Sequence, residues 1–186
     1  MTQRTTTKLR FSSARQVVEA VPHIQREFEG EALDVDPIEF VQDLVRKGKA
    51  SKALTLCCYL LSRHDVTRWA CWALRSLPVA WSASDQALLA AAESWAIKPS
   101  DNSRLAAFRA AKDSGYSTAP AWAAAAAGWA GGNMVESAET TIPPPPYLTG
   151  QAVKISFELM ALLIAPEKRP VLEHYAVAGA LKLLEA

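Results

Sequence analysis

The chain has 186 residues, of which 50% are apolar and 21% are charged, a composition typical of one ordinary globular domain. Its 20 basic and 19 acidic side chains leave a net charge of +1, which argues against a nucleic-acid binder because neutralising phosphates requires a basic excess. The longest apolar stretch, residues 152–165, is interrupted by Lys154 and Glu158, so no segment reads as a membrane span or an export signal. These features predict a cytoplasmic protein.

Start and stop signals divide the chain into about eight or nine predicted helices. Serine, threonine and aspartate side chains cap helix starts, whereas glycine and proline mark helix ends. In chain order we expect a first helix from Ser12 or Ser13 to about Glu29, with a kink or break at Pro22. Further helices are expected from Pro37 after Asp36 to Gly48, from Lys49 to Arg63, from Asp65 to before Pro78, from Ser82 or Ser84 to before Pro99, from Asp101–Ser103 to Gly115, through the alanine run after Ala119, from Thr149, and after Pro166. No alternating strand pattern competes with this interpretation.

The expected architecture is all-α, an irregular bundle of helical hairpins. It is not a regular solenoid, because no signature recurs at a fixed period. We expect a flexible basic tail over residues 1–12, a single helical domain over residues 13–186, and an internal proline-rich loop over residues 131–148. The segments 53–61 and 153–163 carry apolar residues around most of their circumference, which predicts a central position in the bundle.

The alanine run carries Trp122 and Trp129, which are seven residues apart and therefore share one helix face. Six tryptophans fall on several predicted helices, and we expect at least four of them to pack in the core or at its boundary.

Four consecutive prolines, Pro143 to Pro146, predict a polyproline II segment of about 12 Å. We expect this segment to pack on an aromatic face of its own bundle, with Trp129 as the contact and Tyr147 as the anchor at its end. The rival interpretation is a ligand for a proline-binding groove of another protein.

The end of the alanine run and the proline loop form the predicted partner-binding surface. Small side chains from Ala123 to Gly132 would let the backbone of a neighbouring protein approach closely. The expected contact residues are Trp129, Tyr147, Pro144 and Pro145, because aromatic side chains dominate binding energy when a partner buries them. The competing interpretation is that this region is internal core.

Three cysteines and one histidine are candidates for a thiol–base pair or a metal site: Cys57, Cys58, Cys71 and His64. They match no catalytic signature, and they lack the paired spacing that a zinc chelate needs. We therefore interpret the cysteines as buried structural residues.

Glu19, His23 and Glu27 are spaced four apart and could share a helix face as a metal site or a proton-transfer pair. Helix-stabilising pairs on a solvated face are the plainer account. The sequence therefore predicts no catalytic residue, no metal site and no cofactor.

Four segments, in this order, resemble an uncharacterised all-helical bacterial domain family: RHDVTRWACWALRSL, LLAAAESWAIKPSDNSRLAAFRAAKDSG, APAWAAAAAGWAGGNM and PPPPYLTGQAV. The family combines a Trp-Ala-Cys helix, an Ala-Glu-x-Trp helix, an alanine-rich helix ending in Gly-Gly, and a proline-rich loop before a Thr-x-x-Ala-Val helix. The resemblance covers about residues 63 to 165. It implies no catalytic residues, and it implies an accessory or adaptor role near bacterial secretion-type gene clusters.

The predicted function is a non-enzymatic interaction or adaptor module that binds another bacterial protein. The alternative is an enzyme or small-ligand-binding protein whose site is dispersed in the sequence. Neither a membrane nor a nucleic acid is an expected partner, and self-association into a homo-oligomer stays open.

Overall fold

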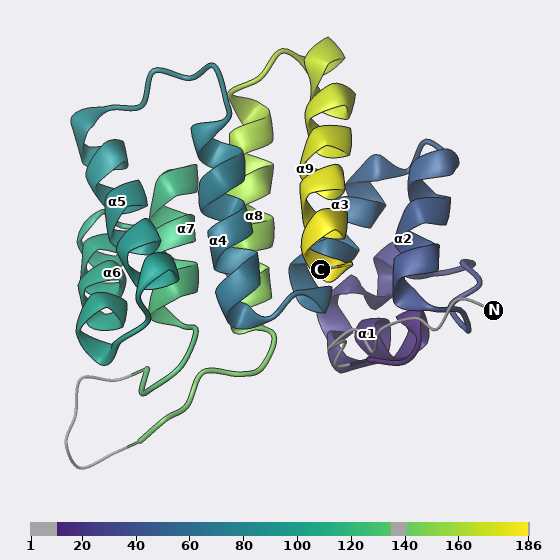
Figure 1. Ribbon diagram of the computed structural model, residues 1–186, viewed down its shortest axis with the longest axis horizontal. Helices are drawn as coiled ribbons and strands as arrows, with labels where there is room; N and C mark the ends of the chain where they lie inside the picture. Colours follow the sequence, from purple (N-terminus) through teal and green to yellow (C-terminus); the bar gives the residue numbers. More distant parts are fainter. Residues whose placement is uncertain (1–10, 135–140, 186) are drawn as a thin grey trace. The chain divides into compact units, whose positions relative to one another are not determined.

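The computed structural model of the protein describes residues 11–134 and 141–185. Within these ranges the chain forms nine α-helices and two 3-10 helices, and no strand (Figure 1). The predicted all-α fold is confirmed. The predicted basic tail falls almost wholly on residues 1–10, which lie outside the described part of the chain.

The helices group into two compact units. Unit 1 holds the described residues up to Leu61 and from Glu167 onward, and unit 2 holds those from Ser62 to Pro166. The helices of unit 1 are α1 (Ala14–Ala20), the 3-10 helix η1 (Pro22–Phe28), α2 (Pro37–Arg46), α3 (Ala50–Leu60) and α9 (Arg169–Leu184). Those of unit 2 are α4 (Arg63–Arg75), α5 (Ala83–Ile97), α6 (Asp101–Asp113), α7 (Ala119–Gly128) and α8 (Leu148–Leu162), and the 3-10 turn η2 (Pro166–Lys168) precedes α9. The sequence predicts a single domain over residues 13–186. It stays a prediction that the two units fold together as one domain.

The start of α4 corrects one predicted helix boundary. Ser62 is the N-cap, whereas the sequence suggested Asp65. The backbone N–H of Asp65 donates to Ser62 Oγ at 3.0 Å, and the Ser62 hydroxyl donates back to the Asp65 carboxylate at 2.6 Å. A serine followed three residues later by an acid is a capping pair in which the serine is the cap, and Ser82 caps α5 in the same way.

Of the kink or break predicted at Pro22, the structure shows a break. Helix α1 ends at Ala20, and the chain continues as the 3-10 helix η1, which begins at Pro22. Proline lacks the N–H that an α-helix needs at this position, and its ring clashes with the preceding turn. The break separates Glu19 from His23, so the two side chains do not share the continuous helix face that their spacing suggested.

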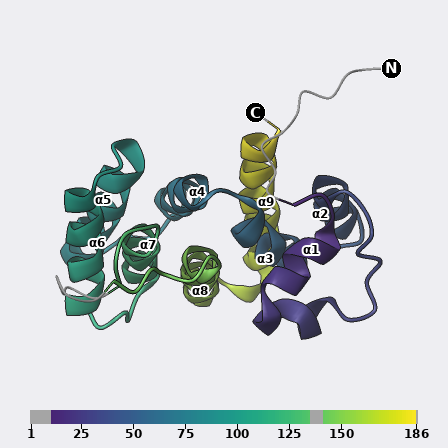
Figure 2. The ribbon, with the colours of Figure 1, turned by 90° about the horizontal axis from the view of Figure 1, so that it is seen from below.

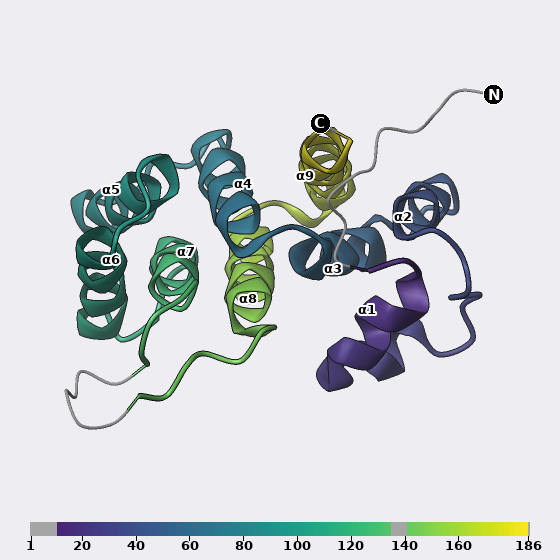
Figure 3. The ribbon, with the colours of Figure 1, turned by 60° about the horizontal axis from the view of Figure 1, so that its bottom comes forward.

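Helix α3 is the central helix of unit 1, as predicted for residues 53–61. It contacts α1, α2 and α9 (Figure 3). Most of its side chains are buried, including Leu56 and Cys57. Polar contacts tie η1 to it, because Thr55 donates to Glu27 at 2.9 Å and Tyr59 lies 2.9 Å from the His23 ring nitrogen Nε2.

An ion cluster connects the loop after η1 to the start of α3. The Glu31 side chain is only 9% exposed, and Oε1 accepts from Lys49 Nζ at 2.7 Å and from Lys52 Nζ at 2.8 Å. These two hydrogen bonds outweigh the desolvation of the carboxylate and lower the pKa of Glu31 from 4.5 to about 2. The charged form is therefore favoured in the folded protein.

Replacing Glu31 by glutamine should reduce the free energy of unfolding by about 1 to 2 kcal/mol near pH 7, because both lysines are partly exposed and screened by solvent. A carboxylate whose pKa is depressed on folding stabilises the protein above its unfolded pKa, and that contribution is lost as the pH falls through the folded pKa. The difference between wild type and Glu31→Gln should therefore shrink between about pH 4.5 and about pH 2. Urea denaturation of both proteins at several pH values across this range measures the difference in free energy of unfolding. A difference independent of pH would contradict the account, and Glu29→Gln, at an exposed position, is the control.

Helix α7 is the central helix of unit 2. It contacts α4, α5, α6 and α8, which surround it in Figure 2. Helix α8, which contains all but the last residue of the segment 153–163 predicted to be central, pairs with it. The Ser156 hydroxyl donates to the carbonyl of Ala119 at 2.7 Å, and the Thr149 hydroxyl donates to the carbonyl of Trp129 at 3.1 Å. Because the start of α8 meets the end of α7, the two helices are antiparallel.

The tryptophans are distributed from core to surface. Trp69 of α4 is 1% exposed and packs against Phe157 of α8 with a centroid distance of 4.7 Å. Trp95 is also buried, and Trp72 is 40% exposed. Trp81, Trp122 and Trp129 are half-buried, so five of the six rings lie in the core or at its boundary.

Candidate functional site

The alanine side chains of α7 are covered by the other helices of unit 2. Ala123 to Ala127 are each 0% exposed. At the end of the helix, a Cβ on Gly128 would lie 2.8 Å from both Cα and Cβ of Phe108 in α6. The expectation that these small side chains admit a partner is therefore wrong for residues 123–128, because α6 and the other helices already occupy that space.

The guanidinium of Arg104 lies against the end of α7. Its Nη1 donates to the carbonyl of Gly128 at 3.0 Å, its Nε donates to Asp101 at 3.0 Å, and its side chain is 8% exposed. Gly132 has a φ of +67°, and a Cβ there would lie 2.4 Å from Arg104 Nη2. Carbonyls at the end of a helix carry partial negative charge and lack intrahelical partners. The arginine supplies one such partner, and Gly132 leaves room for it.

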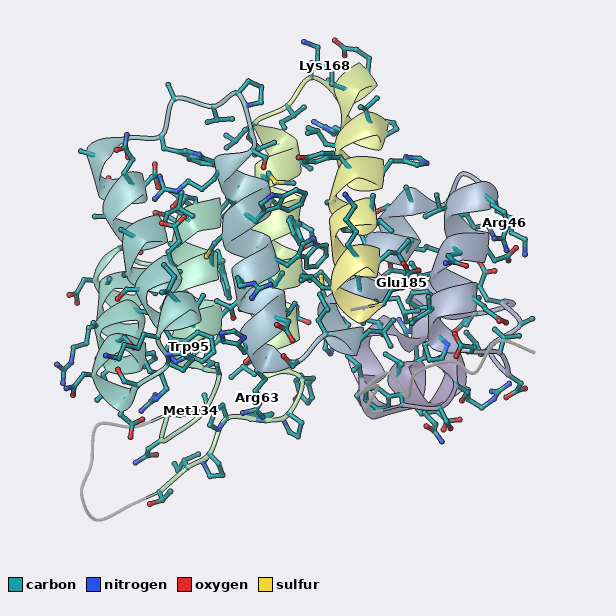
Figure 4. The ribbon with its side chains drawn as sticks, in the orientation of Figure 1. Arg46, Arg63, Trp95, Met134, Lys168 and Glu185 are labelled. Carbon is teal, nitrogen blue, oxygen red and sulfur yellow. The ribbon has the colours of Figure 1, made fainter. Side chains whose placement is uncertain are left out.

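A second arginine, Arg63 at the start of α4, fixes the proline-rich segment. Its Nη1 donates to the carbonyl of Ala130 at 3.2 Å, and its Nη2 lies 3.3 Å from the carbonyl of Pro144 and 3.5 Å from that of Pro145. Figure 4 shows Arg63 and Met134 at the same end of unit 2. The arginine therefore joins the end of α7 to the segment that leads into α8.

The loop is also closed at its base. The backbone N–H of Met134 donates to the carbonyl of Ile142 at 2.8 Å, and the N–H of Ile142 donates to the side-chain oxygen of Asn133 at 2.7 Å. Residues 135–140, part of the predicted loop over 131–148, lie outside the described residues. The hydrogen bonds among Asn133, Met134 and Ile142, which flank that stretch, thus fix the position of the backbone at the start of the proline segment.

Three half-buried aromatic rings gather beside α7: Tyr116, Trp122 and Trp129. The two indoles meet edge to face at a centroid distance of 6.0 Å, which confirms that they share one face. Tyr116 stacks on Trp129 at 5.9 Å with an interplanar angle of 23°, and it lies 5.5 Å from Trp122. We call these three rings the aromatic cluster. Each such pair contributes about 0.5 to 1.5 kcal/mol beyond the area it buries.

Tyr116 has a φ of +55°, the only positive value among the described non-glycine residues. It follows Gly115, which lies two residues after the end of α6 and has a φ of +67°. A left-handed conformation costs an ordinary L-residue about 1 to 2 kcal/mol, so the ring contacts with both tryptophans offset a backbone cost. Tyr116 is not among the site residues predicted from the sequence. The available signal was an aromatic residue directly after a helix-ending glycine.

The structure brings the four expected contact residues to one end of α7, but it gives them different roles. Tyr147 precedes α8 and is 36% exposed. Trp129 belongs to the aromatic cluster. Pro144 is buried and Pro145 is half-buried, and Arg63 holds their carbonyls. Pro144 therefore positions the segment, and its ring is not presented to a partner.

The candidate thiol–base residues divide between the units. Cys57 and Cys58 belong to unit 1, whereas Cys71 and His64 belong to unit 2. Burial raises the pKa of the Cys57 and Cys71 thiols to about 12, so both stay protonated at neutral pH. Nε2 of His64 lies 2.7 Å from the carbonyl of Ala96. These contacts are those of packed structural residues.

The buried polar side chains of the described region serve helix packing. Thr55, Thr67, Arg104, Thr149 and Ser156 each hydrogen-bond to a carbonyl or a carboxylate. Within residues 11–134 and 141–185, no group of three or more histidine, cysteine or acidic side chains is placed to hold a metal ion. None of the helices in these ranges combines the length and the apolar character that crossing a membrane requires.

Comparison with known proteins places the chain in a family. No curated protein and no solved structure matches it. A family model matches residues 40–184, which span α3 to α9 and most of α2 and include Arg63, Arg104, the aromatic cluster and the proline segment. The chain therefore belongs to a family of unknown function, DUF6931.

Proposed function

We propose that the protein is a non-enzymatic interaction module that docks a partner protein through the aromatic cluster and Tyr147. The observation that carries this proposal is the cluster itself, three half-buried rings beside α7 that include a tyrosine held in a left-handed backbone conformation. Residues in such conformations are concentrated at functional sites, where surrounding contacts offset their cost.

The composition of the cluster suits protein recognition. Tryptophan and tyrosine are the residues most enriched among those that dominate binding energy. Here ring-on-ring packing restricts their rotamers before any partner arrives, which lowers the entropy lost on binding. Arg63 and Arg104 fix the backbone at the end of α7 and the segment before Tyr147. A surface whose side chains and backbone are fixed before binding supports docking of a folded protein or an ordered segment.

The alternative, an enzyme or small-ligand-binding protein, has less support. The buried polar side chains of the described region are engaged in helix packing, and burial raises the pKa of the Cys57 and Cys71 thiols. The family resemblance also implies an accessory role in a bacterial secretion-type system. This role, which would identify the partner as a component of such a system, stays a prediction.

Alanine substitution at Trp122 or Tyr147 should weaken partner binding while leaving the fold intact. The test captures the partner of the tagged full-length chain from its native cell and measures its affinity for each purified variant. An anchor residue contributes about 2 kcal/mol, so each substitution should weaken binding by about 30-fold.

Trp72→Ala is the matched control, because Trp72 is exposed on α4 and lies outside the cluster. The thermal midpoint of each variant is measured in parallel. Unchanged capture by Trp122→Ala and Tyr147→Ala, combined with a large drop in thermal midpoint, would mean that the rings serve only internal packing and that the proposed surface is wrong.

A further inference from the structure

The first three of the four consecutive prolines have a backbone conformation that follows from their chemistry. Each proline ring fixes φ near −65°, and a proline disfavours the helical region for the residue before it. Pro143, Pro144 and Pro145 meet both conditions, since each is a proline followed by a proline. They therefore adopt polyproline II, which has three residues per turn. Pro146 follows them at the start of a turn, in which the backbone N–H of Leu148 donates to the carbonyl of Pro145 at 3.1 Å. Its ring comes three residues after that of Pro143 and so continues the same edge of the helix.

The exposure of the individual prolines repeats with the same period of three residues. Pro143 and Pro146 are exposed, whereas Pro144 is buried and Pro145 is half-buried. Arg63 holds the carbonyls of Pro144 and Pro145 from the bundle side. One edge of the helix is thus fixed to unit 2, and the opposite edge, which we call the proline ridge, faces solvent.

We propose that the proline ridge, Pro143 and Pro146, is a preformed ligand for an aromatic-lined groove on the partner protein. This inference rests on the proposed function and names the kind of partner. Aromatic-lined grooves recognise polyproline II helices because the helix is already extended and loses little entropy on binding. Arg63 and the closed loop base restrict the segment further before it meets a partner.

The chemistry of the segment also specifies the groove. Residues 141–149 contain no charged side chain. Ile142 before the ridge is 46% exposed, and Tyr147 after it is 36% exposed. Because Arg63 engages the carbonyls of Pro144 and Pro145, the ridge offers apolar rings more than backbone acceptors. The matching groove is therefore apolar and aromatic, and it is not an acidic or basic surface.

The test titrates the purified full-length protein with two isolated aromatic-groove domains, a WW domain and an SH3 domain, by isothermal titration calorimetry. We expect at least one of them to bind, and Pro143→Ala/Pro146→Ala to weaken that binding at least tenfold. The control is Pro78→Ala/Pro99→Ala, which removes two exposed prolines from other links of unit 2 and should leave the affinity unchanged. If neither domain binds the wild type, or if binding does not depend on the two ridge prolines, the proposal is wrong.

The same variants separate this inference from the proposed function. Capture of the native partner should be lost with Pro143→Ala/Pro146→Ala and retained with Pro78→Ala/Pro99→Ala. If the ridge variant retains the partner while Trp122→Ala loses it, the ridge proposal is overturned and docking through the aromatic cluster stands. Circular dichroism verifies that each variant is folded, and the single variants Pro143→Ala and Pro146→Ala replace the double variant if it is not.

Discussion

Replacing Trp69 by alanine should lower the free energy of unfolding by about 3 to 5 kcal/mol, the loss expected when a buried tryptophan is truncated. The ring is 1% exposed and packs edge-on against Phe157, so it joins α4 to α8. Removing it leaves a cavity between two helices that both contact α7. Urea denaturation of purified protein measures the change.

Trp72→Ala is the control for this effect, because Trp72 lies on the same helix and is 40% exposed. Its replacement should cost less than about 1 kcal/mol. Trp69→Phe keeps a ring against Phe157 and should fall between the two variants, which preserves the test if Trp69→Ala does not fold. Equal losses for Trp69→Ala and Trp72→Ala would contradict the packing described for α4 and α8.

Replacing Gly128 by alanine should destabilise the protein, although alanine is the better helix former by about 1 kcal/mol. The new Cβ would lie 2.8 Å from the Cα and Cβ of Phe108. Both are atoms that move only if α6 shifts, and such overpacking costs about 1 to 3 kcal/mol. We therefore expect a net loss of up to about 2 kcal/mol in urea denaturation.

Gly131→Ala should have the opposite sign. Among the described residues, no atom lies within 4 Å of a Cβ at Gly131, and its φ is not in the left-handed range. Alanine at such a position stabilises by about 0.4 to 1 kcal/mol, because it restricts the unfolded chain. If both substitutions stabilise the protein, α6 and α7 do not approach as closely as the structure describes.

Most helices could be predicted from the sequence because their start and stop signals are local. Asp36 before Pro37 marks the start of α2, and Gly48, with a φ of +71°, follows its end. The start of α4 was misplaced because Ser62 and Asp65 are both good caps, and only the hydrogen bonds between them show which residue is the cap.

The central position of α7 could not be predicted from apolar stripes. A helix made almost wholly of alanine has no polar face to compare with an apolar one, so the width of its stripe says little. Small side chains instead allow the backbones of neighbouring helices to approach, as the contact between Gly128 and Phe108 shows. The same feature led to the wrong expectation that residues 123–128 admit an outside partner.

The residues that organise the candidate site were also hidden from the sequence. Arg63 contacts carbonyls 67 to 82 residues away, and Arg104 contacts one 24 residues away. No local pattern indicates such pairings. The pairing of Trp122 and Trp129 could be predicted because seven residues are about two turns of an α-helix, which returns both rings to one face. Tyr116 instead joins them from the turn before α7.

Oxidative footprinting of the tryptophans, with and without the captured partner, tests the proposed docking surface most directly. Hydroxyl radicals modify exposed side chains, and mass spectrometry reports each site. Partner binding should protect Trp122 and Trp129, while Trp72 on α4 stays reactive. Equal modification of Trp122 and Trp129 in the free protein and in the complex would contradict docking through the aromatic cluster.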